Sequence, residues 1–352
     1  MPSADNDRAL PVEIAGGNID REGLRKRLAC VNEIYHAVEA GFAEYLRENN
    51  YVTVSTPSIV STIGACENWQ TLFTLDNGSE IFRYLTQTGQ LYLEGALIDC
   101  AKVACVIKSF RKEAIQDERH IWEFHLLEIE GAYDFEALLR EMAAIYRKLH
   151  VSVLANVGKA ARTTLECDED YLRSQCDAEV RPVSYTECVE KLDGRLTWGE
   201  DLSPADERAI VEMTTSGKAP IFVTRFPTAI KFFNMETDPA DPRCVLSVDL
   251  ILPVAGEAAG GAQRIRNGAR LKQRLSESEM YRHHVAGGGS YADFKPYVDM
   301  IEQERTPLHS GCGFGAERII QGILRRKDIR LCSTDYMSKL LFSWDSLGIR
   351  GG

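Results

Sequence analysis

Apolar side chains recur at helical spacing in two long parts of the chain. Across residues 21–49 and again across 134–157 they lie three or four positions apart, which predicts two long amphipathic helices. Shorter helices are predicted for 89–103 and 270–279. Residues 310–324 are expected to run from a glycine-rich strand into a helix.

Short β-rich segments alternate with these helices and predict strands. The predicted strands are 51–57, 80–85, 105–111, 123–133, 221–236 and 243–253. Residues 256–261, rich in glycine and alanine, are expected to form a turn. Because the strands come as hairpins rather than as repeated βαβ units, the pattern favours an α+β fold, an antiparallel β-sheet flanked by helices.

The chain is expected to hold one domain. Residues 1–18 are polar and predict a flexible N-terminal arm, and 19–352 predict a single domain with a possible inserted, acidic segment at about 158–220. No uninterrupted apolar stretch is long enough to span a membrane, and the N-terminus lacks a signal-peptide pattern. A cytoplasmic protein is therefore expected.

Charge and cysteine content narrow the function. The 41 basic and 52 acidic residues give a net charge of −11, which argues against a protein that works mainly on nucleic acid. The 10 cysteines include no C-x-x-C pair, so we interpret them as reduced core thiols rather than zinc ligands.

The hairpin at 105–133 gathers charge. Alternation along its second strand places Glu128 and Glu130 on one face, and Arg111 and Glu113 are expected on the facing strand. Such a surface is either an exposed, salt-bridged hairpin or a site for a charged ligand. Standard phosphate-binding loops are missing from the sequence, so any nucleotide would be held by arginines and a metal.

Three ordered motifs resemble those of class II aminoacyl-tRNA synthetases. The hairpin is similar to motif 2, Gly311-x-Gly313-x-Gly315-x-x-Arg318 is similar to motif 3, and the helix and strand ending at Pro57 are similar to motif 1. Three segments, 84–94, 198–202 and 249–264, resemble the asparaginyl-tRNA synthetases. The aspartyl enzyme is the near relative.

The resemblance implies an ATP-dependent ligase that forms an aminoacyl-adenylate. It implies that Arg111 contacts the α-phosphate, that Arg318 lies over the adenine and reaches the γ-phosphate, and that Phe124 stacks on the other face of the adenine. Arg119 and His120 would lie beside the β- and γ-phosphates. The remaining ATP contacts implied are Glu113 and Gly315.

The resemblance also assigns metal and amino-acid contacts. Asp249 and Glu257 match the acidic pair that carries Mg²⁺, although a strand-end charge and a turn residue are the simpler readings. Gln90 and Glu128 would meet the α-ammonium or a side-chain amide. Arg264 would meet the side-chain oxygen. Aspartyl enzymes carry lysine where this chain has Leu93, which favours a neutral side chain such as that of asparagine.

The chain also departs from the family. Only about 20 residues precede the motif 1 helix, so we expect the N-terminal anticodon-binding domain to be missing. The motif 2 loop, 114–118, carries two acids and no base, which argues against tRNA as a partner. The C-terminal run from Cys332 also differs from the usual ending of the family.

Three functions remain open from the sequence. The first is activation of asparagine, aspartate or a close analogue, with transfer of the acyl group to ammonia or another amine, as in an asparagine synthetase-like or specialised biosynthetic ligase. The second is aminoacylation of tRNA, or a tRNA-like acceptor, through its acceptor end. The third is a non-catalytic regulatory paralogue. ATP and Mg²⁺ are the implied cofactors, and a homodimer through residues 30–57 is the implied assembly.

Overall fold

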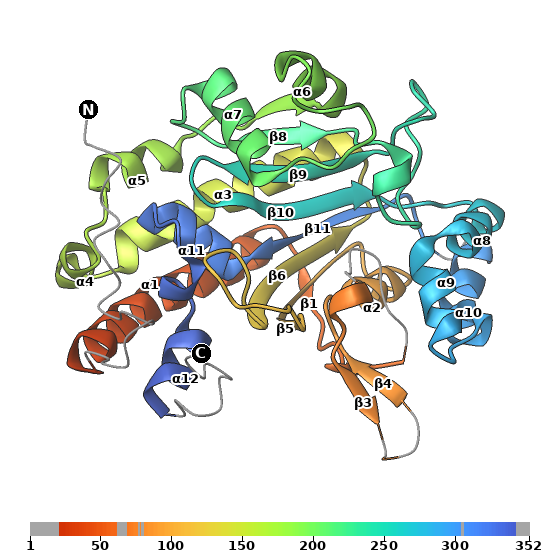
Figure 1. Cartoon of the computed structure of the whole chain (residues 1–352), viewed down its shortest axis with the longest axis horizontal. Helices are drawn as coiled ribbons and strands as arrows, with labels where there is room; N and C mark the ends of the chain where they lie inside the picture. Colours follow the sequence, from red (N-terminus) through yellow and green to blue (C-terminus); the bar gives the residue numbers. More distant parts are fainter. Residues whose placement is uncertain (1–20, 62–68, 77, 79–80, 304–305, 343–352) are drawn as a thin grey trace.

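An eight-stranded sheet forms the centre of the computed structural model, which describes residues 21–61, 69–76, 78, 81–303 and 306–342 (Figure 1). The expected arm at 1–18 lies outside the described residues. In spatial order the strands are β1 (Val52–Thr53), β5 (Lys102–Phe110), β6 (Glu123–Gly131), β11 (Ser310–Gly315), β10 (Gly256–Gln263), β9 (Ser247–Leu252), β8 (Ile221–Thr224) and β7 (Arg181–Ser184). The six inner strands of this order pair antiparallel with one another, whereas the edge strands β1 and β7 pair parallel with their neighbours, β5 and β8. The predicted α+β class is confirmed.

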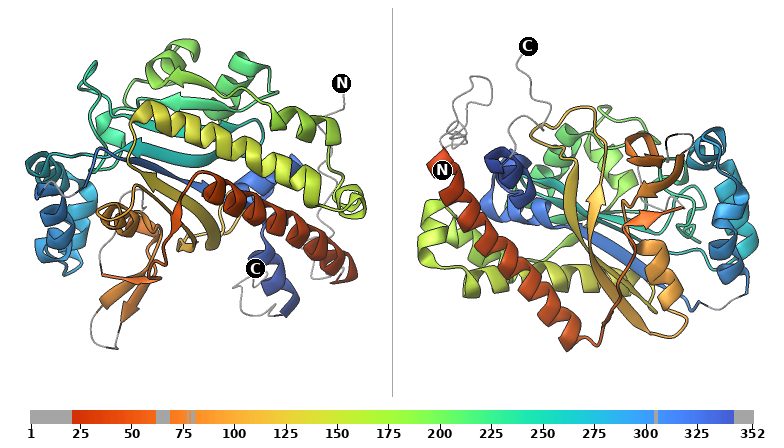
Figure 2. Two further views of the ribbon diagram at one scale, coloured as in Figure 1. Left: turned by 180° about the vertical axis from the view of Figure 1, so that it is seen from behind. Right: turned by 90° about the horizontal axis from the view of Figure 1, so that it is seen from below.

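Three helices cover one face of this sheet: α1 (Arg21–Glu48), α3 (Phe135–Asn156) and α11 (Ala316–Leu324). In the left view of Figure 2, which is seen from behind, α1 and α3 lie side by side in front of the strands. Their close approach depends on small residues, because the Ser152 hydroxyl donates to the Ala37 carbonyl at 2.7 Å and a Cβ on Gly41 would lie 2.6 Å from the Ser152 Cβ.

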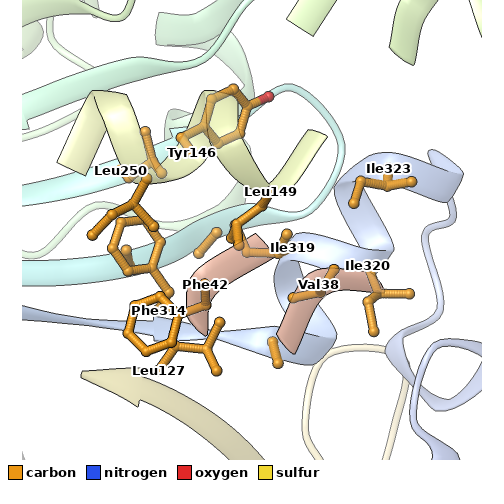
Figure 3. Close-up of a cluster of buried hydrophobic side chains, with 14 of the residues drawn as sticks. Val38, Phe42, Leu127, Tyr146, Leu149, Leu250, Phe314, Ile319, Ile320 and Ile323 are labelled. Carbon is orange, nitrogen blue, oxygen red and sulfur yellow. The ribbon is translucent and has the colours of Figure 1, made fainter. Parts of the chain in front are cut away.

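The main core lies between these helices and the sheet. Leu127 and Phe314 from neighbouring strands pack against Phe42 of α1 and Ile319 of α11 (Figure 3). The pattern of β6 explains this arrangement, because its residues alternate between the helices and the opposite face of the sheet. The helix-facing positions, Leu127 and Ile129, are fully buried.

Smaller elements surround the sheet. A three-stranded sheet is formed by β2 (Ile59–Val60), β4 (Ile81–Leu85) and β3 (Thr74–Asp76), and α2 (Gln90–Ala96) follows it. The segment from 158 to 220 contains α4 (Lys159–Thr164), α5 (Glu169–Cys176), α6 (Tyr185–Lys191) and α7 (Pro204–Thr215), and its strand β7 extends the main sheet. The remaining helices are α8 (Gly268–Glu277), α9 (Glu279–Ala286), α10 (Tyr291–Glu302) and α12 (Thr334–Phe342). Among the described residues, no helix is long and apolar enough to cross a membrane.

Several predicted boundaries were wrong. The helix predicted at 89–103 ends at Ala96, because the residues from Lys102 pair with β6 along a ladder that a helix could not form. The strand predicted at 221–236 ends at Thr224 and is followed by Pro227 and a 3₁₀ turn, Thr228–Ile230. The strand predicted at 243–253 is β9, which is shorter at both ends.

The predicted turn at 256–261 is a strand. Glycine and alanine signal turns in an isolated sequence, but here β10 lies between β9 and β11 and receives ladder hydrogen bonds from both. Within this strand Gly261 is needed for space, since a Cβ there would lie 2.7 Å from the Cβ of Cys312.

The glycines of β11 give a test of this close packing. A Cβ on Gly311 would lie 1.9 Å from Glu130 Oε2 and 2.4 Å from the Ile129 carbonyl oxygen, whereas on Gly315 the nearest atom is Arg318 Cγ at 3.5 Å. Gly311→Ala should therefore lower the free energy of unfolding by about 1–3 kcal/mol, measured by urea unfolding, and Gly315→Ala should change it far less. Equal losses in the two variants would contradict this account.

Candidate active site

A cavity of about 430 Å³ lies over the middle strands of the sheet. Its lining comes from α2, β6, β9, β10, β11, the loop between β5 and β6, and the first turn of α11. Every site residue predicted from the sequence lines it: Gln90, Arg111, Glu113, Arg119, His120, Phe124, Glu128, Asp249, Glu257, Arg264, Gly315 and Arg318. These positions span 229 residues of chain (318 − 90 + 1), and the fold brings them to one place.

Strand alternation builds the floor of this cavity. Glu128 and Glu130 occupy the face of β6 opposite Leu127 and Ile129, as predicted, and both are buried. Arg111 and Glu113, by contrast, lie beyond the end of β5, so the expectation that they share a face of that strand was wrong.

Arginines dominate one end of the cavity. The guanidinium of Arg111 lies 5.2 Å from the centre of the Phe124 ring. Arg318 is aimed by three acceptors, since it donates to the carbonyls of Ala255 (3.0 Å) and Arg119 (2.7 Å) and to the Gln321 side chain (2.9 Å). Burial lowers the pKa of Arg318 to about 10, which leaves it cationic at neutral pH. This end is suited to polyphosphate.

The sequence did not reveal Glu207, which holds one of these arginines. This residue of α7 lies 3.5 Å from an Arg119 nitrogen, and it contacts Gly256, where the backbone φ of +73° favours glycine. Burial, with the nearby charge of Glu257, raises the pKa of Glu207 to about 7. His120, in contrast, is exposed and pairs with Asp117 at 2.9 Å.

An acidic pair lies beside the arginines. Asp249 and Glu257 converge above Gly260, where an added Cβ would lie 3.5 Å from Asp249 Oδ1 and 3.4 Å from Glu257 Oε1. The described residues contain no group of three or more side chains arranged to hold a metal. Two carboxylates nevertheless fit Mg²⁺, because Mg²⁺ commonly takes one or two carboxylates and completes its shell with phosphate and water.

Lys231 is a further residue that sequence reasoning missed. Its ammonium lies 2.6 Å from Asp249 Oδ2 and over the ring of Phe226. Burial raises the pKa of Asp249 to about 7, against the opposing effect of this ammonium. Only the folded chain brings Lys231 to this carboxylate, since 18 residues separate them in sequence.

The other end of the cavity is organised by Arg264. This fully buried guanidinium pairs with Glu130 through two contacts, of 3.2 and 3.3 Å, and donates to the Gly311 carbonyl at 3.0 Å. Its Nε also lies 3.9 Å from Glu94. Burial raises the pKa of Glu130 to about 7, although the Arg264 charge opposes that rise.

Glu94 is fully buried and has several hydrogen-bond partners. It accepts hydrogen bonds from Gln90 (2.9 Å), Tyr297 (2.8 Å) and Asn234 (3.3 Å), and it pairs with His309 at 3.1 Å. Burial opposes its ionisation, but these partners and Arg264 lower the pKa of Glu94. Its place one turn after Gln90 on α2 was the signal that could have identified it.

Glu128 lies at the junction of the two ends. It accepts from the Gly89 backbone N–H at 2.8 Å, from the Thr88 hydroxyl and from the Cys105 thiol at 3.4 Å. Burial raises the pKa of Glu128 in spite of these donors. Its carboxylate is thus held in one orientation on the cavity floor.

Comparison with known proteins gives the family. The family of class II tRNA synthetases (D, K and N) matches residues 19–334, so the chain belongs to it and is an ATP-dependent ligase of the amino-acid-activating type. Within the family it is similar to asparaginyl members. Asparagine–tRNA ligases of Desulforamulus reducens and Chloroflexus aurantiacus are each 33% identical, over 322 and 311 residues, and cover 89% and 83% of this chain.

Solved structures of asparaginyl-tRNA synthetases are also similar to this chain. Asparaginyl-tRNA synthetase from Pyrococcus horikoshii, complexed with asparaginyl-adenylate, superposes with a TM-score of 0.77 at 29% identity and covers 88% of this chain and 68% of its own. The Entamoeba histolytica enzyme gives a TM-score of 0.70 at 26% identity, over 87% and 67%. The two sequence relatives are covered over 70% and 65% of their length. The chain thus spans about two thirds of these relatives.

The Arg264–Glu130 pair gives a stability test. Glu130→Ala would leave a buried guanidinium without its main partner, so it should lower the free energy of unfolding by about 3–5 kcal/mol in urea titrations. The matched control is Glu136→Ala, which removes an exposed pair with Arg225 (3.4 Å) and should cost no more than about 1 kcal/mol. Similar losses in both would show that Arg264 does not depend on Glu130.

Proposed function

We propose that this chain forms an aminoacyl-adenylate from ATP and asparagine, aspartate or a close analogue, with asparagine preferred. The observation that carries the proposal is the gathering of the predicted site residues around one cavity with a cationic end and a charge-compensated end. The Pyrococcus horikoshii relative was solved with asparaginyl-adenylate, and its likeness to this chain supports the same ligand here.

The cationic end would bind ATP. Arg111 and Arg318 would place positive charge beside the phosphates, with Phe124 and Arg318 on either side of the adenine and Glu113 and Gly315 at its edge. Arg119, oriented by Glu207, and His120 would meet the outer phosphates. Mg²⁺ held by Asp249 and Glu257 would supply charge neutralisation as diphosphate leaves.

The chemistry needs no protein nucleophile. The substrate carboxylate attacks the α-phosphorus and diphosphate departs, so the protein contributes orientation and stabilisation of the charge that develops at phosphorus. Gln90 and Glu128 would bind the α-ammonium. The buried, hydrogen-bonded Glu128 is pre-positioned for this role by Gly89 and Thr88.

The compensated end favours an amide side chain. Arg264 is paired with Glu130 and lies near the ionised Glu94, so its positive charge is already matched before any substrate arrives. A substrate carboxylate would therefore add uncompensated negative charge to a buried site, whereas an amide oxygen would accept from Arg264 without that cost. Leu93, buried beside this end, adds no positive charge.

Two acceptors for the acyl group are each favoured by an observation. The loop between β5 and β6 presents Asp117 and Glu118 and thereby favours a small amine over a polyanion. The relatives named as asparagine–tRNA ligases favour tRNA at least as well. A preference for the amide side chain counts against ammonia capture of activated aspartate. A regulatory, non-catalytic role is not favoured, because the charged residues assigned to ATP, metal and amino acid all line the cavity.

We also propose a homodimer through residues 30–57. The side chains of Val52 on β1 and Val106 on β5 are 50% and 42% exposed, and a groove beside them is lined by Phe42 and Leu46 of α1. Because β1 is an edge strand, a second copy covering this face would bury both the apolar surface and the strand edge.

ATP–diphosphate exchange tests the activation step. Across a panel of amino acids, exchange should depend on asparagine and should exceed that with aspartate by at least about tenfold in kcat/KM, because one uncompensated charge is worth more than ~1.4 kcal/mol. Silence across the panel, with ATP still bound, would refute adenylation. Higher exchange with aspartate would refute the charge argument.

The matched variants for this assay lie next to each other. Arg111→Ala should reduce exchange by roughly 10²–10³-fold without unfolding the protein, since it removes a donor aimed at developing charge. Lys112→Ala removes the neighbouring exposed cation and should leave exchange unchanged. An equal effect of the two would mean that only the general charge of the loop matters.

Release of AMP shows which molecule accepts the acyl group. With asparagine and ATP present, the acidic loop predicts that AMP release rises saturably with an amine, tested with ammonium and a panel of primary amines, and not with bulk tRNA. A rise with tRNA alone would contradict an amine acceptor and establish the alternative. Exchange activity measured in parallel keeps a failure of activation separate from a wrong acceptor.

A further inference from the structure

A charged cluster lies on the helix-facing side of the β5–β6 hairpin. Its members come from α12 and from four other elements. They are Lys108 of β5, Glu123 and His125 of β6, Tyr35 of α1, Glu317 of α11, and Asp335 and Lys339 of α12. None of these residues belongs to the predicted site, and α12 lies within the C-terminal run in which the sequence departs from the family.

The centre of the cluster is a double contact between His125 and Glu317. The His125 backbone N–H donates to Glu317 Oε2 at 2.9 Å, and its ring Nδ1 lies 2.9 Å from Oε1. Glu317 is almost completely buried. Phe124 precedes His125 and Arg318 follows Glu317, so this contact ties together the two chain segments that form the arginine-rich end of the cavity.

Helix α12 supports this contact from outside. Asp335 Oδ2 lies 3.8 Å from His125 Nε2 and 3.0 Å from Lys108, and Lys339 pairs with Glu123 at 2.9 Å. Tyr336, Met337 and Leu340 anchor the helix in the main core. The helix therefore binds the hairpin through charged side chains near the loop end of the hairpin, while the apolar side of the helix packs in the core.

We propose that α12 is a positioning element for the nucleotide end of the site: Asp335 holds His125 against Glu317, and this contact sets Phe124 and Arg318 for ATP. The inference rests on the proposed function, because it assumes that ATP occupies this end. Asp335 and His125 are positioning residues, since neither lines the cavity.

The charge state of His125 is consistent with this role. Burial opposes protonation, but the carboxylates of Glu317 and Asp335 raise the pKa of His125, with Lys108 opposing them. The protonated ring can donate to Glu317 and attract Asp335 together. Because folding raises the pKa of His125, the stabilisation by its protonated ring is fully present below the ordinary histidine pKa. It is lost as pH rises through the pKa of His125 in the folded chain.

The test compares Asp335→Asn and His125→Gln in the full chain. Isothermal titration should show ATP binding weakened by about tenfold in both, while KM for asparagine in the exchange assay changes by less than about twofold. ATP affinity should also fall as rising pH removes the proton from His125. In Asp335→Asn this fall should occur at lower pH, because one of the carboxylates that raise the pKa of His125 is gone. Glu136→Gln, which removes an exposed charge outside the cluster, should match the wild type.

Each outcome of this test either supports or overturns the positioning role. Unchanged ATP affinity in both variants, or equal weakening of ATP and asparagine, would overturn the positioning role. If His125→Gln does not fold, Asp335→Asn decides, because it keeps the shape of a partly exposed side chain. A wild type that binds no ATP would overturn the proposed function itself, whereas a wild type that binds ATP as tightly as the variants would overturn only this inference.

Discussion

Alternation along β6 is the constraint on which the rest of this structure depends. Leu127 and Ile129 point to α1, α3 and α11 and help form the core, while Glu128 and Glu130 point to the cavity. Since side chains of a strand alternate between two faces, the stability of the core and the chemistry of the site are set by one register. A slip of one residue would bury two glutamates in the core and expose the leucine and isoleucine to the cavity.

The same register explains why glycine is required on the neighbouring strand. Gly311 and Gly313 lie opposite Glu130 and Glu128, so a side chain there would occupy the space of the glutamates. Arg264 can then reach the Gly311 carbonyl and Glu130 together. The glycines of the motif thus make room for charged groups of the protein itself, besides any ligand.

Charge compensation divides the cavity into two functional ends. Arg111 and Arg318 face the cavity beside Arg119, which Glu207 orients. Arg264, by contrast, is matched by Glu130 and Glu94 within the protein. This difference is the physical basis for assigning phosphates to one end and a neutral side chain to the other. The C-terminal helix reaches the first end from behind the sheet, through His125 and Glu317.

The sequence alone determined the long helices, the charged hairpin and the motif residues, because periodicity and motif spacing are local properties. It did not reveal Lys231, Glu207 or Glu94 as partners of those residues, since each meets its counter-charge only after distant segments pack together. It misassigned β10 as a turn, because glycine and alanine become a strand only when two neighbouring strands supply the hydrogen bonds. Which carboxylates are paired, and hence which charges are left for a substrate, was decided only by the tertiary structure, because electrostatic compensation depends on distance in space rather than on distance in sequence.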